Sequence, residues 1–253
     1  MTMTINMNRP TGCLSTALIL LLGMLFSIPV SAQPVPSAAR EDVGLSMAKL
    51  SQAEVASLLS KIEVTFLTTT SLGTAFEQEK KISFFDDTIR STGALFFQSP
   101  DKVRMDTFTP FKTSAVANGP SAIQYEFVNG GWRSLDTATN GMLHAVMKNI
   151  ISWLQGKFND ASLYQVTGAR KDHGTWLTLT PKKSEYQKHI KYFELGINKA
   201  VNGLDSILIM LPDGDYTRYK FYNDRINVPL SPDLFDAKAP APAALPPWLD
   251  PAQ

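Results

Sequence analysis

The sequence is poor in the residues that most often carry chemistry. It has one cysteine, Cys13, and three histidines, His144, His173 and His189. A single cysteine excludes an intrachain disulfide. Cys13 lies at the start of an apolar run rather than after it, so it does not belong to a lipoprotein-type cleavage box. The histidines are far apart, and none has a partner at metal-ligand spacing. We therefore expect no metal site and no thiol chemistry.

Catalytic motifs are missing too. The sequence has no G-x-S-x-G elbow, no phosphate-binding loop and no dinucleotide fingerprint. Asp213-Gly214-Asp215 offers too few oxygen ligands for calcium and is typical of a hairpin turn. Glu77 and Glu79 could act as paired carboxylates in acid–base chemistry. Their strand is rich in charges, however, and nothing nearby would raise the pKa of a carboxyl group. The pattern therefore favours a solvated strand face. We expect a protein that is not an enzyme and uses no cofactor.

The chain also lacks a surplus of either charge. It has 24 basic and 23 acidic residues, and Arg9 is the only charged residue in the first 32. The remaining chain therefore has equal numbers of both signs. Nucleic acid binding requires a concentrated positive surface, so nucleic acid is not an expected partner. The balance also argues against adhesion to anionic membranes by charge alone.

A single long apolar run lies near the N-terminus, at residues 14–28, and small residues follow at 30–32. This pattern predicts a secretory signal peptide over residues 1–32, cleaved after Ala32. The alternative, a retained anchor, requires only that cleavage fails, although the run is short for a bilayer. The 221 residues after Ala32 suffice for one domain with a hydrophobic core.

The stretch 92–108 dominates the rest of the sequence. Apolar residues alternate on both sides of the turn at 99–102, which predicts a β-hairpin. The pattern predicts that Leu95, Phe97, Val103 and Met105 share one face. Phe96 and Phe108 place large rings on the other. A sheet that is apolar on both faces must be covered twice, by core on one side and by a lid or ligand on the other. We assign the face of Leu95 to the ligand cavity.

Helices are predicted before and within the series of strands. Ser51 and Glu54 form a capping box at the start of an amphipathic helix that extends to Phe66. A second helix, predicted at 140–156, has almost no polar face. Two interpretations remain open: it is a core helix, or it is a lid that packs on the sheet with one side and on an apolar ligand with the other. Segment 227–235 is expected along a sheet edge because of its prolines. The second helix contributes these candidate lining residues: Met142, Met147, Ile150 and Trp153.

Two segments resemble a known family. GALFFQSPDKVRMD is similar to the G-x-L-x-F-x-x-P-x-x-x-R segment of the periplasmic lipoprotein carrier (LolA) family, and it places the motif residues at Pro100 and Arg104. DGDYTRYKFYNDRINVPLSPDLFD is similar to the end of that family. The resemblance covers roughly residues 49–236, between a flexible leader at 33–48 and an Ala/Pro-rich flexible tail at 237–253.

The resemblance implies a mainly β fold with helices (α+β): a half-open, curved antiparallel β-barrel closed by a helical lid. It also implies a periplasmic monomer that shields lipoprotein acyl chains between an inner-membrane donor complex and an outer-membrane acceptor. One departure is Ser99, where the founding carriers have an arginine before the motif proline, so a related lipid is an alternative cargo. An envelope lipid or lipoprotein sensor acting through a protein partner is the alternative function.

Overall fold

The computed structural model describes residues 48–83, 87–135, 147, 150–155, 162–171, 174–201 and 203–236. The predicted signal peptide, the tail, Met142 and most of the leader lie outside the described residues, as does much of the helix predicted at 140–156. None of the helices within the described ranges is long and apolar enough to cross a membrane.

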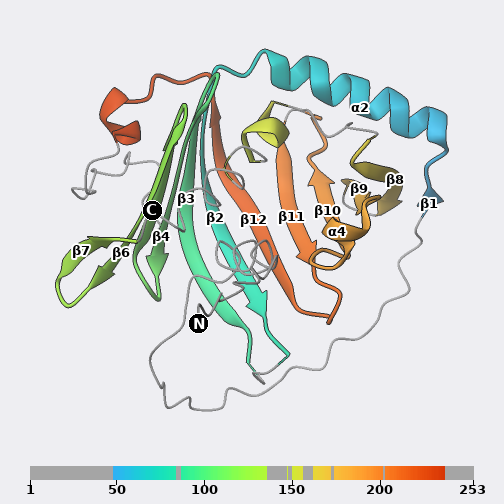
Figure 1. The fold of residues 1–253 in the computed structure, drawn as a ribbon. Helices are drawn as coiled ribbons and strands as arrows, with labels where there is room; N and C mark the ends of the chain where they lie inside the picture. Colours follow the sequence, from blue (N-terminus) through green and yellow to red (C-terminus); the bar gives the residue numbers. More distant parts are fainter. Residues whose placement is uncertain are drawn as a thin grey trace, which may run out of the picture.

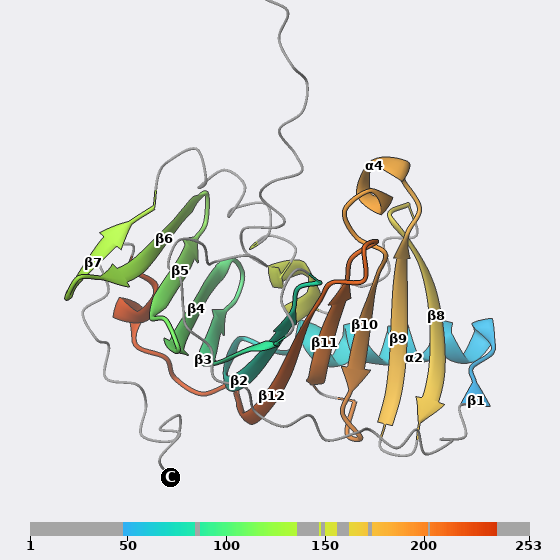
Figure 2. The ribbon, with the colours of Figure 1, turned by 90° about the horizontal axis from the view of Figure 1, so that it is seen from below.

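One curved, open antiparallel sheet forms most of the structure (Figures 1 and 2). Across the described residues its order is β1-β8-β9-β10-β11-β12-β2-β3-β4-β5-β6-β7. This confirms the predicted mainly β fold class. The strands are β1 (Ala48–Lys49), β2 (Ser71–Lys81), β3 (Ile89–Gln98), β4 (Lys102–Thr109), β5 (Thr113–Asn118), β6 (Ser121–Val128), β7 (Gly131–Ser134), β8 (Tyr164–Lys171), β9 (Gly174–Pro181), β10 (Tyr192–Ile197), β11 (Leu204–Met210) and β12 (Tyr216–Ile226).

Helix α2 (Gln52–Leu67) runs along one end of the sheet on the side of β8 to β12 (Figure 1). It begins with the predicted capping box, in which the Ser51 side chain accepts from the Glu54 backbone N–H and the Glu54 carboxylate accepts from the Ser51 N–H. Its apolar stripe packs on the sheet because residues spaced by three and four share one face. The buried positions are Val55, Leu59, Ile62 and Phe66.

Two shorter helices were not predicted, α4 (Ser184–Gln187) and the 3₁₀ helix η1 (Pro232–Phe235). Ala48, which the sequence assigned to the leader, instead pairs with Arg170 through β1. The strand forms there because the edge of β8 offers free backbone groups to the passing chain.

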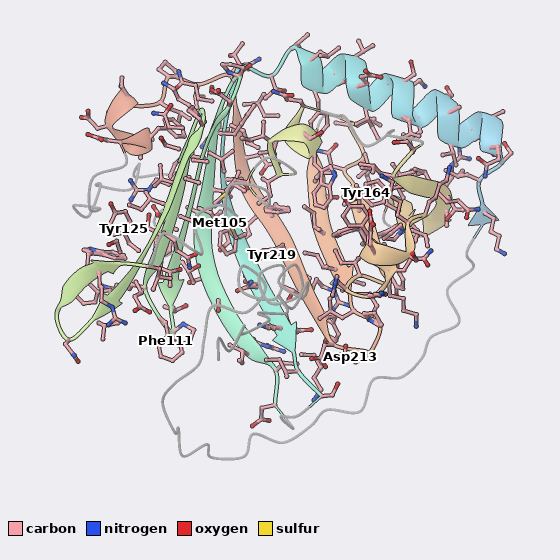
Figure 3. The ribbon with its side chains drawn as sticks, in the orientation of Figure 1. Met105, Phe111, Tyr125, Tyr164, Asp213 and Tyr219 are labelled. Carbon is pink, nitrogen blue, oxygen red and sulfur yellow. The ribbon has the colours of Figure 1, made fainter. Side chains whose placement is uncertain are left out.

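The central hairpin forms as predicted, from β3 and β4. Leu95 stands opposite Met105, Phe97 opposite Val103, and Phe96 opposite Arg104. Since side chains alternate across a strand, the sheet has an inner face that carries Leu95 and an outer face that carries Phe96. The inner face joins the main core with α2, and Met105 and Tyr219 lie in its middle (Figure 3).

The outer face is covered by the end of the described chain. Leu234 and Phe235 of η1 pack on Phe96, and Phe235 is fully buried. The prediction that segment 227–235 follows a sheet edge is therefore wrong, because its apolar side chains gain more by covering the exposed rings of β3. The second cover that the two-faced hairpin requires is thus this segment, not a ligand.

Gly93 of β3 leaves room for the ring of Phe76 and for the backbone of β4. A side-chain carbon at this position would collide with the Asp106 carbonyl oxygen and with the ring of Phe76. We expect Gly93→Ala to lower the free energy of unfolding by about 2–3 kcal/mol, because the neighbouring backbone cannot move aside. Urea unfolding followed by circular dichroism measures the loss. Gly131→Ala is the control, since nothing lies within 4 Å of its added carbon; equal losses would contradict the prediction.

Candidate functional site

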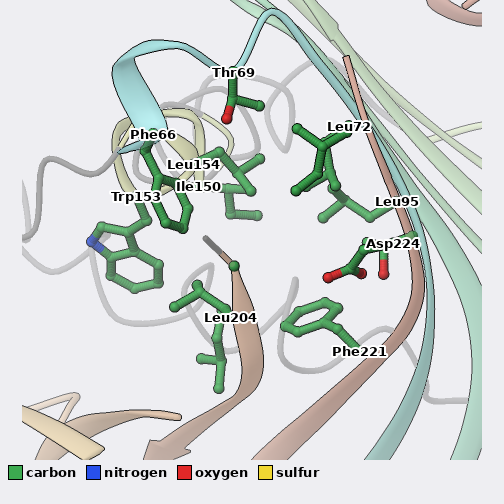
Figure 4. A pocket seen from close by; sticks show the side chains of 14 residues that line it. Phe66, Thr69, Leu72, Leu95, Ile150, Trp153, Leu154, Leu204, Phe221 and Asp224 are labelled. Carbon is green, nitrogen blue, oxygen red and sulfur yellow. The ribbon is translucent and has the colours of Figure 1, made fainter. Parts of the chain in front are cut away.

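A largely apolar cavity opens between the inner face and the helical segments (Figure 4). Its volume is about 50 Å³. This is far below the roughly 300–1,000 Å³ of typical ligand sites, so the cavity as it stands has no room for an acyl chain. The described lining residues are Phe66, Thr69, Leu72, Thr74, Leu95, Ile150, Trp153, Leu154, Gly203, Leu204, Ile207, Phe221, Asp224 and Ile226.

Residues 150–155, which we call the lid, close one side of this cavity. Residues 150–154 are helical, and the Trp153 ring packs edge-on against Phe193 at 4.9 Å between centroids. At the end of the lid, the Gln155 side-chain amide donates to the Pro100 carbonyl oxygen at 2.7 Å. The lid thus rests on the sheet through apolar packing and one polar contact to the β3–β4 turn.

The structure brings the predicted lining residues into one core but not all to the cavity. Leu95, Ile150 and Trp153 line it. Phe97, Val103 and Met147 are fully buried in the same core and do not line it. Met105 is partly buried and packs against this core. Met142 lies outside the described residues.

Sequence analysis missed most of the cavity wall contributed by β2, β11 and β12. Leu72, Ile207 and Phe221 lie on alternating strand positions, and that alternation was a usable signal for them. Two other lining residues had no such signal. Gly203 lies just before β11, and the direction of the Asp224 side chain depends on the register shift in β12. Sequence position alone could not have placed them at the cavity.

Asp224 is the ionisable residue among the lining positions. Two residues of β12, Asn223 and Asp224, stand opposite Thr74 because the register shifts between Tyr222 and Arg225. Asn223 has a φ of 59°, a left-handed conformation that bends the strand. The Asp224 side chain consequently points into the ring of apolar residues (Figure 4) while remaining exposed at the rim.

The surroundings shift the protonation equilibrium of this carboxyl. Partial desolvation raises the pKa of Asp224 above its usual range. The Thr74 hydroxyl acts in the opposite direction, and the negative charge of Asp205 adds to the rise. Within the described part of the chain, no ion pair includes Asp224. Asp224 is therefore a polar group at the rim of an apolar cavity and has no counter-ion among these residues.

The two motif residues have separate positions. Pro100 lies in the β3–β4 turn and contacts the lid through its carbonyl oxygen. Arg104 lies on the outer face, away from the cavity, where its Nε donates to both Asp106 carboxylate oxygens at 2.9 and 2.7 Å. Its Nη1 donates to the Leu234 carbonyl oxygen at 3.2 Å. Arg104 therefore holds the C-terminal segment on the outer face.

Glu79, one of the two carboxylates considered for acid–base chemistry, lies on the outer face as well. It forms ion pairs with Arg90 at 3.6 Å and Arg218 at 3.4 Å and accepts from the Tyr216 hydroxyl at 2.7 Å. These contacts occupy the carboxylate in cross-strand pairing. Among the described residues, no group of histidine, cysteine and acidic side chains is arranged to hold a metal ion.

Comparison with known proteins identifies a family. The model described as outer membrane lipoprotein carrier protein LolA matches residues 67–238. No curated protein sequence matches the chain.

Several solved structures are similar to this chain. MucB in the MucA/MucB complex of Pseudomonas aeruginosa is 14% identical with a TM-score of 0.42, covering 73% of this chain and 61% of that one. The chain thus spans about three fifths of that structure. The lipoprotein LppX of Mycobacterium tuberculosis is 10% identical with a TM-score of 0.41, covering 72% and 99%. A LolA superfamily protein of Nitrosomonas europaea is 9% identical with a TM-score of 0.36, covering 72% and 96%.

Proposed function

The chain belongs to the outer membrane lipoprotein carrier (LolA) family, and from this premise we propose that it carries the acyl chains of lipoproteins or of a related lipid across the periplasm. Members of the family are carriers and binding proteins rather than enzymes. The signal peptide expected at 1–32 supports export, an inner-membrane donor complex would supply the cargo, and an outer-membrane acceptor would receive it. The carrier would act as a monomer.

The observation that supports this proposal is the apolar cavity between the lid and the inner face. Transfer of each acyl methylene from water to an apolar site is favourable by about 0.8 kcal/mol. A cavity lined by Leu95, Trp153 and Phe221 supplies such a site. An acyl chain does not fit in about 50 Å³, so loading requires the lid to move away from the sheet. A lid held mainly by packing can move without breaking the hydrogen bonds of the sheet.

Native mass spectrometry of the protein purified from the periplasm tests the cargo directly. Bound lipid supports the carrier, whereas a stable complex with another protein and no lipid supports the sensor that the sequence left as the alternative. If neither lipid nor a protein partner is bound and the empty protein takes up no fatty acyl probe, the proposed function is wrong.

A substitution in the cavity wall should weaken lipid uptake. Ile207 is partly buried and lines the cavity, and Ile207→Asn would place an amide against the acyl chain with no hydrogen-bond partner. Leaving such a group unpaired costs about 1–3 kcal/mol, so affinity for a fluorescent fatty acid should fall at least about fivefold. Fluorescence titration measures it. Val64→Asn is the control, because Val64 is 63% exposed on α2; equal effects of both variants would contradict the assignment.

A further inference from the structure

We propose that Asp224 selects the head group of the cargo, so that the cavity prefers amphiphiles whose head group carries an amine or ammonium nitrogen. This inference rests on the proposed function, because it assumes that the acyl chain occupies the apolar cavity. The head group would then lie at the rim, where Asp224 is exposed to solvent.

The backbone places the carboxylate there. Tyr222 pairs with Ala75 and Arg225 with Gly73, so the strand accommodates one extra residue opposite Thr74. Bulges of this kind redirect a side chain relative to the regular alternation. Gly203 lies close to this carboxylate, since a side-chain carbon at position 203 would lie 3.3 Å from Asp224 Oδ2. The small residue at 203 leaves the carboxylate accessible from the cavity.

The chemistry of the lining fits a nitrogen head group better than an anionic one. Of the fourteen described lining residues, Asp224 alone is ionisable, and none is basic. Asp205 adds a second negative charge close enough to affect Asp224. A carboxylate or phosphate head group placed at this rim would be repelled and would find no cation among the lining residues. An ammonium group would be attracted, and its N–H groups would donate to Asp224.

Two matched amphiphiles test the preference. Dodecylamine and dodecanoate have the same chain length and opposite charges at pH 8. Each is added below its micelle concentration to the delipidated mature protein, and displacement of the neutral dye N-phenyl-1-naphthylamine is measured. An exposed ion pair contributes up to about 1 kcal/mol, so attraction and repulsion together should make dodecylamine bind about threefold to tenfold more tightly.

Variants identify the responsible carboxylate. Asp224→Asn should bring the affinity ratio of the two amphiphiles close to one, and Asp224→Glu should retain the preference. Asp213→Asn is the control, because it removes the same charge from the β11–β12 turn, at the end of the hairpin far from α2 (Figure 3). It should leave the ratio unchanged. If circular dichroism shows that Asp224→Asn does not fold, Asp224→Ser replaces it.

The outcomes separate the inference from the function on which it rests. A wild-type ratio near one, a ratio that persists in Asp224→Asn, or an equal loss in Asp213→Asn would overturn the role of Asp224 while dye binding still supported the cavity. If neither the dye nor either amphiphile binds, the proposed function fails and the head-group preference fails with it.

Discussion

Tying the lid to the sheet is expected to block lipid loading. The side chain of Gln155 already reaches the Pro100 carbonyl at 2.7 Å, and Ser99 beside it is exposed. Cysteines introduced by Gln155→Cys and Ser99→Cys can therefore be bridged by a short bis-maleimide. Because the cavity measures only about 50 Å³ with the lid in place, we expect uptake of a fluorescent fatty acid by the bridged, empty protein to fall to background. Stopped-flow fluorescence before and after bridging measures the rate.

The control bridge leaves the lid free. Glu126 and Arg133 are cross-strand neighbours on β6 and β7, at one edge of the sheet. Bridging Glu126→Cys to Arg133→Cys should leave the loading rate unchanged. The native Cys13 lies within the predicted signal peptide and would be removed with it. If the bridge between residues 155 and 99 leaves loading equally fast, the lid does not gate the cavity, and access would require the sheet itself to open.

Loss of the Arg104 side chain is expected to destabilise the protein strongly without changing the residues that line the cavity. Burial raises the pKa of the Asp106 carboxyl above its usual range, and the positive charge of Arg104 opposes that rise. Arg104→Leu removes the counter-ion and the donor to the Leu234 carbonyl. Breaking one side of a buried pair typically costs about 3–5 kcal/mol, and we expect a loss of that size in urea unfolding.

The double variant distinguishes the ion pair from simple packing. Arg104→Leu with Asp106→Leu removes both charges, and replacement of a buried pair by apolar residues is often nearly neutral, so most of the stability should return. Arg133→Leu serves as the comparison, because its pair with Glu126 leaves the arginine side chain 70% exposed, and its loss should cost less than about 1 kcal/mol. A double variant as unstable as Arg104→Leu would refute the account.

Local sequence patterns determined much of this architecture. The alternation in 92–108 predicted which residues share each face of the hairpin, because a strand has a period of two that neighbours cannot change. The capping box at Ser51 and Glu54 marked the start of α2, since it depends on residues three apart. The apolar character of segment 140–156 predicted a helix that packs on the sheet as core or as lid, and Ile150 and Trp153 pack in the same core as Leu95.

Tertiary structure alone decided the other features. Arg104 and Leu234 are 130 residues apart, and their contact, which places the C-terminal segment on the outer face, follows from the way the whole sheet curves. The position of Asp224 at the cavity depends on one extra residue opposite Thr74, a mismatch between two strands that neither strand reveals separately. The size of the cavity likewise depends on how tightly the lid packs against β3, β11 and β12. Local pattern predicts the faces of the sheet, whereas long-range packing decides what covers each face.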